Sequence, residues 1–83
     1  MDNKNLRLRV MTPTGTALDT QTESLRLHAA DGSLGIRKGH TAALILLKAG
    51  DIAYTTEGVT KIYPLKREAF AKVKDDLVTI ITK

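Results

Sequence analysis

The chain has 83 residues, which is enough for one small domain that buries little more than half of its unfolded surface. Because it contains no cysteine, disulfides and thiolate metal sites are excluded. The net charge of +4 is compatible with an acidic partner without requiring one. No apolar run reaches the roughly 18 residues of a membrane-spanning helix, so we expect the chain to contact a membrane only through another protein.

Apolar and polar residues alternate near the start of the chain and again in its first half. Residues 6–10 read Leu-Arg-Leu-Arg-Val, and residues 25–29 read Leu-Arg-Leu-His-Ala. A period of two over several residues is typical of a strand with one buried face and one wet face. Residues 77–82 are rich in β-branched side chains and predict a further strand at the end of the sequence.

Turn signals separate these segments at short intervals. They lie at residues 12–15, 31–32, 38–39, 49–51, 57–58 and 74–76. Many short strands divided by such turns predict an all-β fold, which we expect to be a small two-sheet β-sandwich or flattened barrel of short antiparallel strands. We expect residues 1–83 to form this single domain.

Three features refine the second half. Residues 52–63, with Glu57-Gly58 at the centre, predict a β-hairpin. Residues 66–73 are rich in helix formers, but a helix of that length is marginal in water, so we predict a strand entered through a turn. Pro64 cannot donate to a strand ladder and therefore predicts an edge position or a bulge.

The sequence carries no catalytic constellation. It lacks a phosphate-binding glycine loop, the His-Glu-x-x-His zinc motif and a nucleophile elbow, and Asp75-Asp76 is interpreted as a solvated turn. We expect no catalytic residue, metal or cofactor, and no enzymatic activity of this chain alone. His40 follows a glycine, which leaves two interpretations open: a turn residue bonded to the backbone, or an interface residue presented by a rigid turn.

Basic residues offer an alternative function. Arg7, Arg9, Arg26 and Lys72 would form a cationic patch if they shared one sheet face, as in small barrels that bind nucleic acid. Tyr54, Tyr63 and Phe70 are not spaced among these cations as a stacking platform for bases would require. We therefore expect a solvated sheet face and no nucleic-acid partner.

Residues 31–40 combine three glycines, two isolated apolar residues and a histidine in the order Asp-Gly-Ser-Leu-Gly-Ile-Arg-Lys-Gly-His. This run resembles the β-domain of the epsilon subunits of F-type ATP synthases, where it has the form acidic-Gly-x-Leu-Gly-Ile-x-x-Gly-His. The resemblance extends over nearly the whole chain. It includes the opening strand with its Thr-Pro-x-Gly turn at 6–15, the strand at 24–27, the apolar run at 44–47, and the closing strands at 70–73 and 78–80.

The resemblance implies a function. The chain would be a non-catalytic central-stalk subunit of the rotor, docking on the gamma subunit and on loops of the c-ring, at the cytoplasmic face of the membrane. It implies that the c-ring and stalk are faced by Gly32, Ser33, Leu34, Gly35, Gly39 and His40. It implies that gamma is faced by Ala43, Leu44, Ile45 and Leu47.

The chain also departs from the family pattern. Arg67-Glu68-Ala69 stands where the family has Ser-Gly-Gly, so this turn must use ordinary backbone angles or store strain. His40-Thr41-Ala42-Ala43 replaces His-Ala-Pro-Leu, and Lys48-Ala49-Gly50 replaces Lys-Pro-Gly. The C-terminal helical hairpin that epsilon subunits carry is absent from this sequence, so we expect either a natural short, epsilon-like subunit or one domain of a longer protein.

Overall fold

The computed structural model describes residues 5–82 and consists of nine β-strands joined by short turns. The strands are β1 (Leu6–Thr12), β2 (Gly15–Thr22), β3 (Ser24–Ala29), β4 (Gly32–Arg37), β5 (Ala43–Leu47), β6 (Gly50–Thr56), β7 (Val59–Leu65), β8 (Ala69–Lys74) and β9 (Leu77–Thr82). No helix occurs among these residues, and therefore none that is long and apolar enough to cross a membrane.

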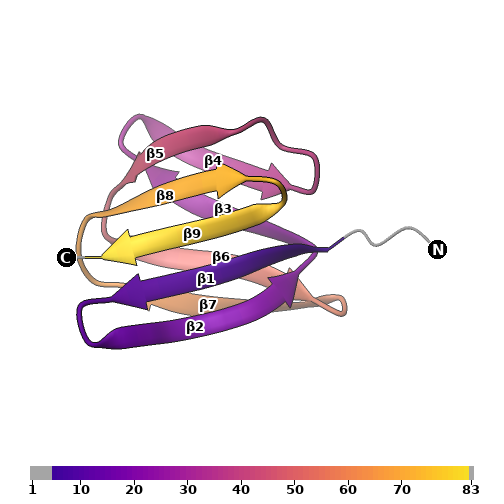
Figure 1. Ribbon diagram of the computed structural model, residues 1–83, viewed down its shortest axis with the longest axis horizontal. Coiled ribbons are helices and arrows are strands. Elements are labelled where there is room, and N and C mark those ends of the chain that lie inside the picture. The colour runs from indigo at the N-terminus through magenta and orange to yellow at the C-terminus, as the bar shows by residue number, and fades with distance from the viewer. Residues whose placement is uncertain (1–4, 83) are drawn as a thin grey trace.

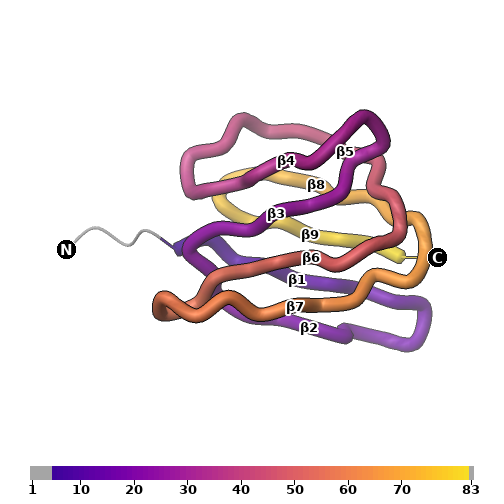
Figure 2. Tube along the Cα trace, turned by 180° about the vertical axis from the view of Figure 1, so that it is seen from behind, coloured from indigo at the N-terminus to yellow at the C-terminus, as the bar shows by residue number. Residues whose placement is uncertain are grey.

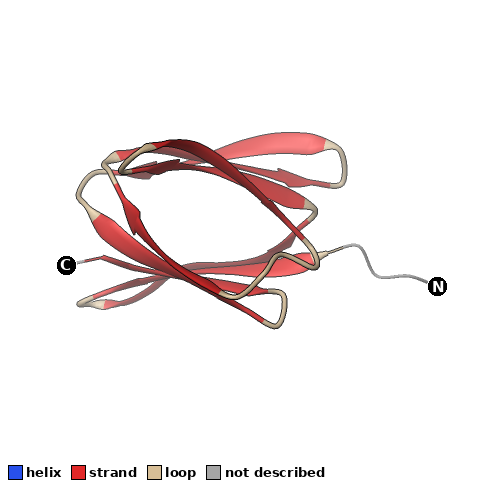
Figure 3. Cartoon of the chain, turned by 90° about the horizontal axis from the view of Figure 1, so that it is seen from above, coloured by secondary structure: helices blue, strands red, loops and turns tan. Residues whose placement is uncertain are grey.

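One curled sheet folds over itself to make two layers (Figures 1 and 3). Its strand order is β2-β1-β9-β8-β5-β3-β6-β7, with β4 paired to the free side of β3. The front layer in Figure 1 is β2-β1-β9-β8-β5, and the rear layer is β4-β3-β6-β7. This arrangement confirms the predicted all-β, two-sheet sandwich. The described strand pairs are antiparallel except β1 with β9, which run parallel because the last strand inserts beside the first.

The two layers are tied at both sides of the sandwich. On one side, Ala29 of β3 pairs with Leu47 of β5, and the Lys48 amide donates to the His28 carbonyl at 2.8 Å. On the other side, Thr22 is buried, and its Oγ1 lies 2.7 Å from the carbonyl oxygen of Thr55 in β6. These cross-links hold the layers at a fixed spacing around the core.

The core follows from the alternation in the sequence. Each layer turns one residue in two inward, and the fully buried side chains include Leu8, Leu27, Ile36, Ile52 and Ile80. β8 contributes the small residues Ala69 and Ala71 at 2% and 0% exposure, which lets the layers approach closely. The trace seen from behind in Figure 2 shows β3, β6 and β7 closing the rear layer over this core.

The predictions for the second half of the chain are confirmed. Residues 50–65 form the β6–β7 hairpin, and Pro64 lies in β7, at the end of the strand order. The segment 66–73 forms a turn followed by β8, because a strand there covers the core with Ala69, Ala71 and Val73. Arg67 and Glu68 are not among the described non-glycine residues with positive φ, so the turn that replaces Ser-Gly-Gly uses ordinary backbone angles.

Candidate docking surface

The outer face of the front layer carries a continuous apolar row. Strand register places Leu46 of β5 opposite Phe70 of β8, Phe70 opposite Ile81 of β9, and Ile81 opposite Met11 of β1. Leu46, Phe70 and Ile81 are 46%, 44% and 49% exposed, and Met11 is half-buried. We call these four residues the outer apolar row. Directly opposed side chains on neighbouring strands contact one another, so the row forms one surface rather than isolated residues.

This row is not required by the core of the domain. Its side chains point away from the buried face, since their strand neighbours Val10, Leu47, Ala71 and Ile80 point inward. Leu44, next to the row on β5, is 73% exposed. Exposed apolar side chains gathered in this way mark interaction sites, whereas single ones need no explanation.

Cations border the row on the same face. The adjacent row crosses β1, β9, β8 and β5, and each of its residues lies opposite the next in the order Arg9, Thr79, Lys72 and Leu44. Arg7 forms a bidentate contact with Asp19, with Nε at 2.7 Å from Oδ1 and Nη2 at 2.9 Å from Oδ2. The hydrogen bond from Arg7 is the main cause that holds the pKa of Asp19 below its ordinary value. Asp19 therefore remains a carboxylate beside the two arginines.

The predicted gamma-facing residues divide between the two sides of β5. Leu44 points outward and is exposed. Leu47 is only 1% exposed and belongs to the core, and Ala43 and Ile45 are half-buried against it. The prediction for Leu47 is therefore wrong, because strand alternation turns it inward. Sequence reasoning missed Leu46, Phe70 and Ile81, since a continuous apolar run does not reveal which residues face outward, and the row becomes visible only through the register.

The predicted c-ring-facing residues form strand β4 and the turn that follows it. Gly32, Ser33, Leu34 and Gly35 belong to β4, where Ser33 and Gly35 are exposed and Leu34 is half-buried. On the outer side of β4, the Arg26 guanidinium covers Gly35, and its Nη1 donates to Ser33 Oγ at 3.1 Å.

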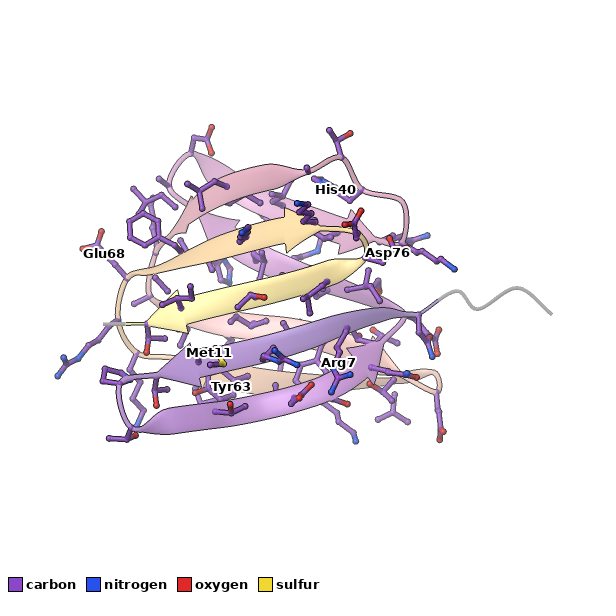
Figure 4. All side chains as sticks on the ribbon, viewed as in Figure 1. Arg7, Met11, His40, Tyr63, Glu68 and Asp76 are labelled. Atoms are coloured by element: carbon purple, nitrogen blue, oxygen red, sulfur yellow. The ribbon has the colours of Figure 1, made fainter. Side chains whose placement is uncertain are left out.

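Gly39 and His40 lie in the connection from β4 to β5. The Gly39 amide donates to Asp76 Oδ1 at 2.7 Å, and the His40 amide donates to the Arg37 carbonyl at 3.1 Å. His40 Nδ1 lies 2.7 Å from the carbonyl oxygen of Thr41. Figure 4 shows His40 and Asp76 at the same end of the molecule, away from Glu68. The corner containing Gly39 is thus exposed and fixed by hydrogen bonds.

The two predicted sets of partner-facing residues meet along one groove. A groove of about 720 Å³ separates the start of β4 from β5. Gly32, Ser33 and Leu34 line one side, and Leu44, Ile45 and Leu46 line the other. The groove and the outer apolar row share Leu46 and together form the candidate docking surface.

The cations considered for nucleic-acid binding do not form one patch. Arg7, Arg9 and Lys72 share the outer face of the front layer, but Arg26 lies on β3 in the rear layer. The common face that the nucleic-acid alternative requires is therefore not formed, because Arg26 lies in the other layer. The front-layer cations alternate with apolar side chains, a pattern that suits a protein partner better than a phosphate backbone. Among residues 5–82, no group of three or more His, Asp or Glu residues is placed to hold a metal ion.

Comparison with known proteins agrees with this fold. The family model of the ATP synthase delta/epsilon chain β-sandwich domain matches residues 5–83. The ATP synthase epsilon chain of Bacillus subtilis (strain 168) is 30% identical over 80 residues, covering 96% of this chain and 60% of the relative. That of Koribacter versatilis (strain Ellin345) is 34% identical over 74 residues, covering 89% of this chain and 51% of the relative. The chain thus spans about half to three-fifths of the length of these relatives.

Solved structures with the same fold come from rotary assemblies. A chain of the Euglena gracilis mitochondrial ATP synthase OSCP/F1/c-ring structure superposes with a TM-score of 0.87 at 21% identity, covering 99% of this chain and 52% of that one. A chain of the Tetrahymena thermophila mitochondrial ATP synthase central stalk/c-ring gives 0.71 at 16% identity, covering 98% and 65%. With the match over residues 5–83, the chain belongs to the ATP synthase delta/epsilon chain β-sandwich family.

Proposed function

We propose that this domain is a non-catalytic subunit of the central stalk of an F-type ATP synthase or ATPase, and that it couples ion transport to ATP synthesis or hydrolysis by joining parts of the rotor. Family membership and the solved assemblies that contain this fold support the proposal. Through such a complex the domain would lie at the cytoplasmic face of the membrane. Two layers held by a packed core suit a part that must transmit torque without deforming.

The observation that carries the proposal is the outer apolar row. A face with three large side chains about half exposed costs free energy in water unless a partner covers it. We propose that the gamma subunit covers the row together with Leu44. The cations at its border favour a gamma surface that presents carboxylates.

The c-ring contact is assigned to β4 and the turn that follows it. Gly32, Ser33, Leu34, Gly35, Gly39 and His40 would face the polar loops of the c-ring and the adjoining stalk. The hydrogen bond between Gly39 and Asp76 supports this assignment, because a fixed turn loses little conformational freedom on binding.

Binding to the cognate gamma subunit tests the proposal. The chain and gamma are expected to co-elute in size-exclusion chromatography at micromolar concentrations. Phe70→Lys places a charge in the middle of the row and should weaken binding at least about tenfold, since the loss of a hot-spot residue costs about 2 kcal/mol or more. Ile62→Lys changes an exposed apolar residue of β7 in the rear layer and serves as the matched control.

Two results would count against the proposal. If the unmodified chain does not co-elute with gamma, the stalk assignment fails. If Phe70→Lys and Ile62→Lys bind equally well, gamma contacts another face. Circular dichroism of both variants verifies that the fold is retained.

A further inference from the structure

β4 is an open strand edge without the features that usually protect one. Among residues 5–82 it pairs only with β3, so alternate backbone N–H and C=O groups on its other side point away from the sheet. Other edge strands are protected: β7 carries Lys61 and Pro64, and β2 carries Asp19 and lies opposite a bulge at Val10/Met11. β4 contains two glycines, no proline and no charge before Arg37.

The surroundings of β4 provide room for one more strand. The groove of about 720 Å³ lies beside this edge, and Leu34, Leu44 and Ile45 give it apolar walls. An added strand would place every second side chain against these walls.

The edge is complementary to a second copy of itself. When two β4 strands run antiparallel with Leu34 opposite Leu34, Asp31 lies opposite Arg37, Gly32 opposite Ile36, and Ser33 opposite Gly35. Opposed residues in antiparallel strands point to the same face, so this register keeps Leu34 and Ile36 on the inner side of both copies.

The charges fit the same register. The pairing of Asp31 with Arg37 occurs twice by symmetry, and no like charges are opposed within the strand. Asp31 and Arg37 are both exposed, and neither has an ion pair with a residue in the described part of the chain. Opposite charges across strands stabilise a register, and like charges destabilise it.

We infer that the free chain forms a two-fold dimer in which the β4 edges pair antiparallel with Leu34 opposite Leu34. Residues 32–35 of this strand also belong to the set proposed to face the c-ring, so the dimer and the docked subunit exclude each other. Dimerisation would protect the open edge until the chain enters a complex. The inference needs only the strand edge and stands apart from the proposed stalk function.

Sedimentation velocity over a concentration series measures the dimer directly. One short strand pair makes a small interface, so we expect a dissociation constant of about 100 µM, bracketed by samples from about 10 µM to about 1 mM at low salt. Asp31→Arg and Arg37→Asp each oppose like charges at both ends of the pair and should weaken dimerisation about tenfold. The double variant restores opposite charges and should regain the unmodified affinity. Glu68→Arg makes the same charge change in the β7–β8 turn and should leave the dimer intact.

Hydrogen exchange identifies the strand that pairs. Amides in residues 32–37 should gain protection as concentration rises, and those of edge strand β7 at residues 59–65 should not. Any one of three results would overturn the inference. The chain could stay monomeric to about 1 mM, the double variant could fail to regain dimerisation, or protection could rise at residues 59–65 instead. Binding to gamma is scored separately, so failure of either proposal is distinguishable from failure of the other.

Discussion

Asp76 accepts a hydrogen bond from the Gly39 amide through Oδ1 at 2.7 Å, and its carbonyl oxygen accepts one from the Arg7 amide at 2.9 Å. One residue of the β8–β9 turn thereby joins the start of β1 to the connection before β5. Because Gly39 directly precedes His40, this contact fixes the backbone that presents the histidine (Figure 4).

Replacement of Asp76 by alanine should loosen this joint. Asp76 has φ +60, which aspartate and asparagine tolerate better than alanine, and alanine offers no acceptor to Gly39. We expect Asp76→Ala to lower the free energy of unfolding by about 1–2 kcal/mol and Asp76→Asn by less than about 0.5 kcal/mol. Urea unfolding of both variants checks this. Equal losses in the two variants would show that the side-chain acceptor is not the cause.

The β6–β7 turn contains strain that a substitution can remove. Glu57 has φ +51 and Gly58 has φ +76, the conformation for which Asn-Gly is the preferred pair. Glu57→Asn should therefore raise the free energy of unfolding by about 0.5–1 kcal/mol, measured by urea titration. Glu68→Asn, in a turn with ordinary backbone angles, is the control and should give no gain. A gain in both variants would point to charge rather than backbone conformation.

Much of the fold could be predicted from residue alternation and turn signals. Residues 6–10 and 25–29 form strands because only that conformation turns their leucines to one side. Residues 66–73 show where a local preference is overridden: alanine and lysine favour a helix in isolation, but Ala69, Ala71 and Val73 bury more apolar surface in a strand.

The candidate docking surface could not be predicted from the sequence of any single strand, because it depends on the order and register of neighbouring strands. Ile81 and Leu46 join one row only because β8 lies between β9 and β5. Leu47 was placed among the gamma-facing residues through the family resemblance, whereas strand alternation turns it into the core. The contact between Asp76 and Gly39 joins residues 37 positions apart, and no local pattern announces it.

Acid should remove the contribution of Asp19 to stability. Since the hydrogen bond from Arg7 lowers the folded-state pKa of Asp19, its contribution is complete above the unfolded value of about 3.9 and is lost as pH falls through the lower folded-state value. The difference in urea midpoint between the unmodified chain and Asp19→Asn should be present at neutral pH and vanish in strong acid. Because the pair is exposed, the difference should be small and should shrink in high salt. A difference that persists at all pH values would contradict the ionic origin.

Gly50 and His28 offer a test of close packing between the neighbouring strands β6 and β3. A Cβ added at Gly50 would lie 2.9 Å from His28 Cδ2, and Gly50 has φ +150, which other residues rarely adopt. Gly50→Ala should cost about 2 kcal/mol in the free energy of unfolding, from the contact and the backbone conformation together.

The double variant separates the two causes. His28→Ala removes the ring that the new Cβ would meet. In urea unfolding, the double variant should therefore be about 1 kcal/mol more stable than the sum of the two single effects predicts. The remaining cost of Gly50→Ala is backbone strain. Gly35→Ala is the control. A Cβ added at Gly35 would lie 3.5 Å from Nη2 and 3.9 Å from Cζ of Arg26, which are ordinary contact distances. Strict additivity of His28→Ala and Gly50→Ala would mean that the ring moves aside without cost and that backbone conformation alone requires the glycine.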